Sequence, residues 1–207
     1  MNWLVRGGFM SSVNEKSGDR RIRRTKRIFK THFISLIREK GYKNVTVTDI
    51  VGRADYNRST FYLYFKDKED LAEELVTEVL DELNKSFRRP FEDTMIVDYK
   101  LILPTSNTFF QHIYEHKYFY GLLKLEDTIP GFREKFLNKF KEIFYAITYI
   151  NNENKEINLD HFNTYKMYGS YGVLLEWIEG GCIKSPEEIA ENLLEIFKTK
   201  EILFKLK

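Results

Sequence analysis

Apolar residues recur at steps of three and four along most of the chain, and this is the period of an α-helix. The longest stripe, with steps of 4, 4, 3, 1 and 3, consists of Phe132, Phe136, Phe140, Ile143, Phe144 and Ile147. No convincing pair of segments alternates between apolar and polar residues as strands do, and only 4 Pro and 11 Gly interrupt the 207 residues. We therefore predict an all-α fold.

Helix-start and helix-stop residues divide this pattern into separate helices. Thr46 precedes Asp49 by three residues, which is the spacing of an N-terminal capping box. Asn57 follows a tight turn at residues 55–57 and is a second candidate cap. We expect helices over residues 20–40, 46–54, 58–65, 68–87, after 104, and over 118–124, 132–147, 159–179 and from 186 onward.

Charge is distributed unevenly along the chain. Residues 1–68 contain 16 basic and 6 acidic side chains, whereas residues 69–207 contain 17 basic and 25 acidic ones. The formal net charge of +2 is therefore the sum of +10 and −8. A basic segment of this kind favours a polyanion as partner.

Residues 46–65 have the size and turn signals of a helix-turn-helix. The second helix has a polar leading edge that begins at Arg58, and Phe61 and Phe65 lie on its opposite face. Arginine can donate two hydrogen bonds to guanine, and hydroxyls can reach bases or phosphates. Two ordinary packed helices are the alternative. The preceding basic run, residues 20–27, either follows phosphates or a minor groove or is a solvated face.

Three stretches, at residues 40–42, 46–50 and 57–71, resemble the TetR family of bacterial transcriptional regulators, and the likeness covers about residues 22–75. In the turn, where this family often has glycine, the chain has Asp55, which tolerates a left-handed backbone. The resemblance implies three DNA-binding helices, a fourth linking helix and a larger dimerising domain. It implies contacts to bases or phosphates from Thr46, Thr48, Asn57, Arg58, Ser59, Thr60, Tyr62, Tyr64 and Lys68.

A second resemblance covers about residues 160–198. Residues 168–178 and 185–188 are similar to one branch of the family, which includes the dihydroxyacetone-kinase operon activator. This branch leaves open a partner protein in place of a small-molecule effector. Altogether we expect a mobile leader at 1–19 (with Met10 as a possible start), a DNA-binding domain at 20–67, a linking helix at 68–89, and a ligand-binding and dimerisation domain at 90–207.

Aromatic residues are concentrated in the second half, where residues 99–177 contain 18 of the 32. We expect either an ordinary helical core or a cavity for an aromatic or lipophilic effector. The candidate lining is Phe109, Phe110, Tyr114, Phe144, Tyr168 and Tyr171.

The last two helices provide apolar faces for a two-fold symmetric dimer, because two recognition helices then match two half-sites. Packing within one chain is the alternative for any of these residues. The candidate interface is Leu174, Leu175, Ile178, Ile189, Leu193, Ile196 and Phe197.

Other reactive residues suggest no further chemistry. His112 and His116 share a helix face, but no third ligand lies near them in sequence, so we predict no metal and no cofactor. Cys182 and His161 lack partners for a catalytic triad, and we predict no enzyme activity. A single cysteine favours a reducing cytoplasm, and no apolar run is long enough to span a membrane.

These observations together predict a dimeric regulator that binds a double-stranded DNA operator. We expect a repressor that an effector releases from the operator. The alternative is a regulator or interaction module whose C-terminal domain binds a partner protein.

Overall fold

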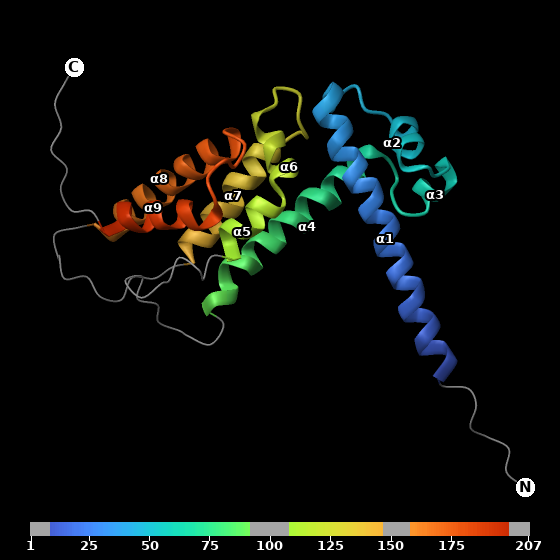
Figure 1. The fold of residues 1–207 in the computed structure, drawn as a ribbon, viewed down its shortest axis with the longest axis horizontal. Coiled ribbons are helices and arrows are strands. Elements are labelled where there is room, and N and C mark those ends of the chain that lie inside the picture. Colours follow the sequence, from blue (N-terminus) through green and yellow to red (C-terminus); the bar gives the residue numbers. More distant parts are fainter. Residues whose placement is uncertain (1–8, 92–107, 147–157, 199–207) are drawn as a thin grey trace, which may run out of the picture. The chain divides into compact units, whose positions relative to one another are not determined.

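The computed structural model describes residues 9–91, 108–146 and 158–198 (Figure 1). Every regular element within these ranges is helical, as the apolar spacing predicts. The chain forms two compact units, residues 1–75 and 76–207, and the boundary lies inside the long helix α4 (Lys68–Arg88). The predicted linking helix corresponds to α4, so the second unit begins earlier than residue 90. No helix of the described ranges is long and apolar enough to cross a lipid bilayer.

The first helix, α1 (Phe9–Lys40), is longer than predicted. It includes residues 9–19, which we expected in the leader, while residues 1–8 lie outside the described ranges. No proline lies between residues 9 and 40, so nothing in the sequence interrupts helical hydrogen bonding there. The helix ends as predicted at Gly41, which has a φ of 79° and donates its N–H to the Ile37 carbonyl at 2.9 Å.

Two short helices, α2 (Val47–Ala54) and α3 (Arg58–Tyr62), lie beside the C-terminal half of α1 (Figure 1). A cluster of buried rings holds α3 in place. The ring centroids of Phe29 and Phe61 are 5.4 Å apart, and those of Phe61 and Phe65 are also 5.4 Å apart. The first pair meets edge to face and the second is tilted, and such contacts between buried rings stabilise a fixed arrangement. Phe61 and Phe65 therefore anchor the second short helix to α1, as their spacing predicts.

Helix α3 ends at Tyr62, three residues earlier than predicted. Beyond it the Tyr64 N–H bonds to the carbonyl of Phe61, three residues back, at 3.0 Å. The same carbonyl also accepts the Phe65 N–H, four residues on, at 3.0 Å, so a tighter turn overlaps the last regular helical bond. Phe65 is nevertheless buried, so the predicted side-chain pattern holds although the helix is shorter.

The second unit contains the remaining helices. They are η1 (Arg89–Phe91), α5 (Thr108–Glu115), α6 (Lys117–Tyr120), η3 (Gly121–Lys124), α7 (Phe132–Tyr145), α8 (Leu159–Glu179) and α9 (Pro186–Lys198). Helix α7 packs against α8, and α5 packs against α9. The α7 stripe is buried at Phe132, Phe136, Phe140 and Ile143, and Ile147 lies outside the described ranges.

Polar caps begin the last two long helices. The Asn158 side chain accepts the His161 N–H at 2.9 Å at the start of α8, and residues 151–157 of the predicted loop lie outside the described ranges. At the start of α9, Ser185 and Glu188 exchange side-chain-to-backbone bonds of 2.8 and 3.2 Å. The predicted Ser185 cap is confirmed.

Candidate nucleic-acid interface

The turn between α2 and α3 depends on one left-handed residue. Asp55 has φ 56° and ψ 45°, and its N–H donates to the Val51 carbonyl. Aspartate is one of the few non-glycine residues that adopt this conformation readily. The turn is therefore short enough to place α3 directly after α2, as a helix-turn-helix requires.

The predicted capping box begins α2. Thr46 Oγ1 accepts the Asp49 N–H at 3.2 Å, and Asp49 Oδ2 accepts the Thr46 N–H at 2.8 Å. Lys40 Nζ also lies 2.8 Å from Asp49 Oδ2. Hydrogen bonds from Lys40 and from Thr46 hold the pKa of the Asp49 carboxyl well below its usual range. Thr46 thus fixes the first turn of α2.

At the start of α3, the Asn57 side chain organises the hydroxyls that follow it. Its Oδ1 accepts the Thr60 N–H at 2.9 Å, the Ser59 hydroxyl at 2.7 Å and the Thr60 hydroxyl at 2.8 Å. Asn57 therefore caps the N-terminus of α3, as the sequence predicts. Ser59 is exposed and Thr60 is half-buried. Each hydroxyl donates inward and keeps acceptor lone pairs.

Arg58 joins the two short helices at their first turns. Its guanidinium donates a hydrogen bond to the Thr48 hydroxyl, and both side chains are exposed. A guanidinium has five N–H donors, so this bond orients Arg58 and leaves most of its donors available to a ligand. The structure thus brings Thr48 and Arg58, both predicted site residues, into direct contact.

The far end of α3 presents one residue that sequence reasoning missed. Leu63 is 76% exposed and Tyr62 is 54% exposed, whereas Tyr64 is half-buried. Leu63 therefore adds an exposed apolar side chain next to the exposed ring of Tyr62. Its spacing of four from Ser59 was the available sequence signal.

The Lys68 side chain, which the sequence predicts to contact a phosphate, contacts backbone carbonyls in this structure. Its ammonium donates to the carbonyls of Tyr42, Lys43 and Val45 at 3.0, 3.3 and 3.0 Å and lies 4.5 Å from the Tyr42 ring centroid. An ammonium has three N–H donors, and all three are used here. Burial, and secondly the charge of Glu69, raises the pKa of Tyr42 to about 12. Lys68 therefore closes the loop between α1 and α2.

The arginines of the basic run on α1 are exposed to solvent. They are Arg20, Arg21, Arg23, Arg24 and Arg27. Arg23 pairs with Asp19 one turn earlier on the same helix. The side chains of Thr25 and Lys30 are buried, so only part of this segment faces solvent.

The predicted effector-binding aromatics contact other rings or lysines. Phe109, Phe110, Phe144 and Tyr171 have neighbouring ring centroids between 4.9 and 6.2 Å away. Tyr114 and Tyr168 lie beneath lysine ammonium groups, at 4.5 and 5.8 Å. Four of the six therefore belong to the ring network of the second unit.

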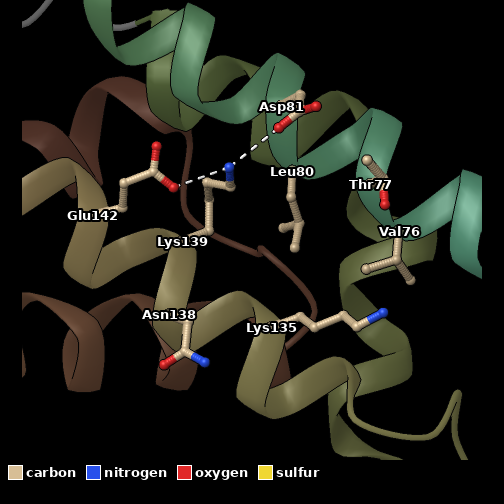
Figure 2. Close-up of a pocket in the computed structure, with 8 residues that line it drawn as sticks. All are labelled: Val76, Thr77, Leu80, Asp81, Lys135, Asn138, Lys139 and Glu142. Carbon is tan, nitrogen blue, oxygen red and sulfur yellow. Dashed lines mark hydrogen bonds and ion pairs between the residues drawn. The ribbon is translucent and has the colours of Figure 1, made fainter.

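A shallow pocket of about 260 Å³ lies between α4 and α7 and has a different lining from the predicted aromatic set (Figure 2). In Figure 2, Lys139 lies between two carboxylates, 3.1 Å from Asp81 and 3.1 Å from Glu142. These ion pairs satisfy the lysine charge within the pocket wall. None of the six predicted aromatic residues lines this pocket.

The predicted dimer residues divide into two groups. Leu174, Ile178, Ile189 and Leu193 are at most 7% exposed in the single chain, so they pack mainly within the protomer. Leu175 and Phe197 are half-buried, and Ile196 is 53% exposed. Apolar periodicity indicates that a helix face is buried, but it does not distinguish burial within one chain from burial against a second copy.

His112 on α5 and His116, which directly follows α5, have a third partner. His116 Nε2 lies 3.9 Å from Glu82 Oε2 on α4, and the His112 and His116 ring centroids are 4.5 Å apart. The prediction of no metal site rested on the lack of a third ligand nearby in sequence, and Glu82 is far from both histidines in sequence. Burial, and secondly the charge of His116, lowers the pKa of His112 to about 4.

The fold and this site together define an all-α protein with an N-terminal helix-turn-helix unit. A family model described as bacterial regulatory proteins, tetR family, matches residues 34–75, and one described as transcriptional regulator C-terminal region matches residues 102–199. One match lies in the first unit and the other in the second. The chain belongs to the TetR family of bacterial regulatory proteins.

Known proteins that are similar to this chain are also regulators by name. The uncharacterized HTH-type transcriptional regulator YxbF of Bacillus subtilis is 23% identical over 176 residues, which cover 83% of this chain and 44% of that protein. The chain thus spans less than half the length of this relative. A TetR-family regulator from Syntrophomonas wolfei has 19% identity and a TM-score of 0.63, covering 85% of this chain and 94% of that one. The dihydroxyacetone kinase operon activator DhaS has 18% identity and a TM-score of 0.53, covering 84% and 94%. Both structures share the fold.

Proposed function

We propose that this protein is a DNA-binding transcriptional regulator that acts as a homodimer on a double-stranded operator. The observation that carries the proposal is the exposed polar surface at the starts of α2 and α3, where Arg58 bonds to Thr48. This surface belongs to the part of the chain with a net charge of +10. Phosphates provide sequence-independent affinity for such a segment, and base edges in the major groove provide specificity.

Each exposed or half-buried side chain of this surface suits one class of DNA contact. Arg58 would read a guanine, and the Ser59 and Thr60 hydroxyls would contact bases or phosphates. Tyr62 and Tyr64 would contact phosphate oxygens. Leu63 suits an apolar partner such as a thymine methyl group. Arginines of α1 would follow the flanking phosphates.

A dimer would use the exposed face of α8. Tyr165 and Tyr168 are exposed there, and a Cβ added at Gly169 or Gly172 would meet no atom within 4 Å. This face of α8 is therefore exposed in the protomer, whereas four of the seven residues predicted for the dimer interface are buried. Two recognition helices related by two-fold symmetry would match half-sites about 34 Å apart.

Repression released by an effector is the proposed mode of action. An effector that binds the second unit would have to bind the DNA-free state more tightly, because only differential affinity shifts such an equilibrium. The effector is either a small molecule or a partner protein. Thermal-shift screening of metabolites, beside a pull-down, separates the two: a stable complex without any metabolite shift favours the protein partner.

A gel shift tests the proposed function directly. The probe is DNA from upstream of the protein's own gene, at low and high salt, with nonspecific competitor. We expect a specific complex that survives the competitor and weakens as salt increases. Absence of a specific complex at every salt concentration would contradict the proposal.

A further inference from the structure

Three potential ligand side chains meet between α4 and α5, within the second unit. Glu82, His112 and His116 each offer one ligand atom, and these atoms lie within 4.8 Å of one another. The backbone N–H of His116 donates to the backbone carbonyl of His112 at 3.0 Å. The two histidines are therefore one helical turn apart, and their side chains share a face.

The packing of α4 on α5 fixes the third residue opposite them. The Thr108 hydroxyl donates to the Ser86 carbonyl, and the Phe87 and Phe109 ring centroids are 6.0 Å apart. Glu82 lies one turn before Ser86 on α4, and His112 lies one turn after Thr108 on α5. The two helices run past each other in opposite directions here, so this register places Glu82 beside His112.

Burial separates the roles of the three side chains. His112 is only 8% exposed, whereas the side chains of His116 and Glu82 are 37% and 49% exposed. His112 is therefore fixed by the surrounding protein, whereas His116 and Glu82 are accessible from solvent. An ordinary ion pair would account for the contact between Glu82 and His116. It would not account for the position of His112 beside them.

The spacing suits a small ion. Zinc binds imidazole nitrogens and carboxylate oxygens at about 2.0–2.2 Å, so tetrahedral ligands lie roughly 3.3 Å from each other. His116 Nε2 and Glu82 Oε2, which are 3.9 Å apart, would need to approach by about half an ångström. Both belong to partly exposed side chains that have freedom to move. Because all three ligand atoms lie within 4.8 Å of one another, no pair would need to approach by more than about 1.5 Å.

His112 also has the outer partners that orient a metal-binding imidazole. Its Nε2 lies 3.1 Å from the Tyr120 hydroxyl, and the ring hydrogen-bonds to the Val79 backbone. Such partners fix the ring and its tautomer. Metal binding requires His112 to give up one of these two hydrogen bonds.

We propose that Glu82, His112 and His116 form a binding site for one divalent first-row transition-metal ion, with zinc as the best-matched ion. Two imidazoles and a carboxylate are a ligand set that zinc uses in proteins, and water would occupy the fourth position. The site is independent of the proposed DNA-binding surface, since all three residues lie in the second unit.

The test is a zinc titration of the full chain in competition with a chromophoric chelator. We expect one zinc per chain. The variants Glu82→Gln and His116→Ala should each weaken binding at least tenfold, because loss of an outer-shell partner alone costs 10–100-fold. Both side chains are partly exposed, so these variants should fold, and circular dichroism checks that they do.

Two matched controls separate the site from adventitious binding. Glu78→Gln removes a carboxylate one turn earlier on α4, and His161→Ala removes an exposed histidine at the start of α8. Both should bind zinc as the unmodified chain does. The proposal is overturned if the unmodified chain binds no zinc, or if either site variant binds it as tightly as the controls. The second result would leave only an ordinary Glu–His ion pair.

Discussion

The Lys68 ammonium lies 3.0 Å from the Val45 carbonyl, and it thereby joins the first turn of α4 to the loop that precedes α2. The same ammonium binds two other loop carbonyls and the face of the Tyr42 ring. Thr46, the cap of α2, directly follows this loop. The position of the helix-turn-helix in the first unit therefore depends on a lysine that does not belong to the motif.

Replacing Lys68 with Ala should lower the free energy of unfolding by about 1–3 kcal/mol, because three carbonyls lose a charged donor. Urea unfolding measures this effect. The slope of operator affinity against salt should stay the same, since the ammonium is not available to a phosphate. Lys66→Ala, which removes an exposed lysine two residues earlier, is the matched control for stability. A smaller salt slope with unchanged stability in Lys68→Ala would contradict this interpretation.

Arg58→Ala should reduce affinity for the operator by about 1–3 kcal/mol and relax selectivity at one base pair. The reason is that Arg58 is exposed and its bond to Thr48 aims the guanidinium from the start of α3. Selection from a randomised operator pool measures the change in preference. Arg53→Ala is the control, because Arg53 lies in the last turn of α2 and pairs with Glu39. If both variants keep the same base preference as the unmodified chain, Arg58 does not read a base.

Local features of this site were predictable from sequence, whereas its long-range contacts were not. Thr46 and Asn57 cap their helices because a cap needs only the residue type and the three residues that follow. The partners of Lys68 lie more than twenty residues earlier in the chain, and no local pattern indicates them. The spacing of Phe61 and Phe65 predicted a buried face, but it did not show that the helix itself ends at Tyr62.

The second unit shows the same division. Periodicity predicted that Leu174 and Ile178 are covered, and they are covered within one chain. The pairing of Glu82 with two histidines depends on the register between α4 and α5, which side-chain packing determines. A sequence pattern on one helix has no information about that register.

Asp49→Asn should destabilise the chain by about 0.5–2 kcal/mol at pH 7, the range for loss of a helix cap. Folding lowers the pKa of the Asp49 carboxyl, so its stabilisation is fully present above the unfolded pKa of about 3.9. The stabilisation is then lost as the pH falls below that value toward the lower folded pKa. Urea unfolding of both proteins from pH 7 down to pH 3 should show a narrowing difference.

Asp160→Asn is the comparison for Asp49→Asn, because it removes a first-turn acid from α8, whose cap is Asn158. It separates the general effect of an acid near a helix start from the reciprocal bonds between Thr46 and Asp49. A difference between Asp49→Asn and the unmodified chain that stays constant over the whole pH range would show that the carboxylate charge is not the stabilising element.

Gly172→Leu should weaken the homodimer while leaving the protomer folded. An added Cβ meets no atom within 4 Å in the protomer, and removing a glycine from a helix interior favours the helix by about 0.8–1 kcal/mol. In a close-packed interface the larger side chain should cost about 1–3 kcal/mol, which corresponds to about 5- to 150-fold in the dimer dissociation constant. Gly52→Leu, at an equally open helical position on α2, should leave dimerisation unchanged. Sedimentation equilibrium measures both constants, and equal values for the two variants would exclude the exposed face of α8 from the interface.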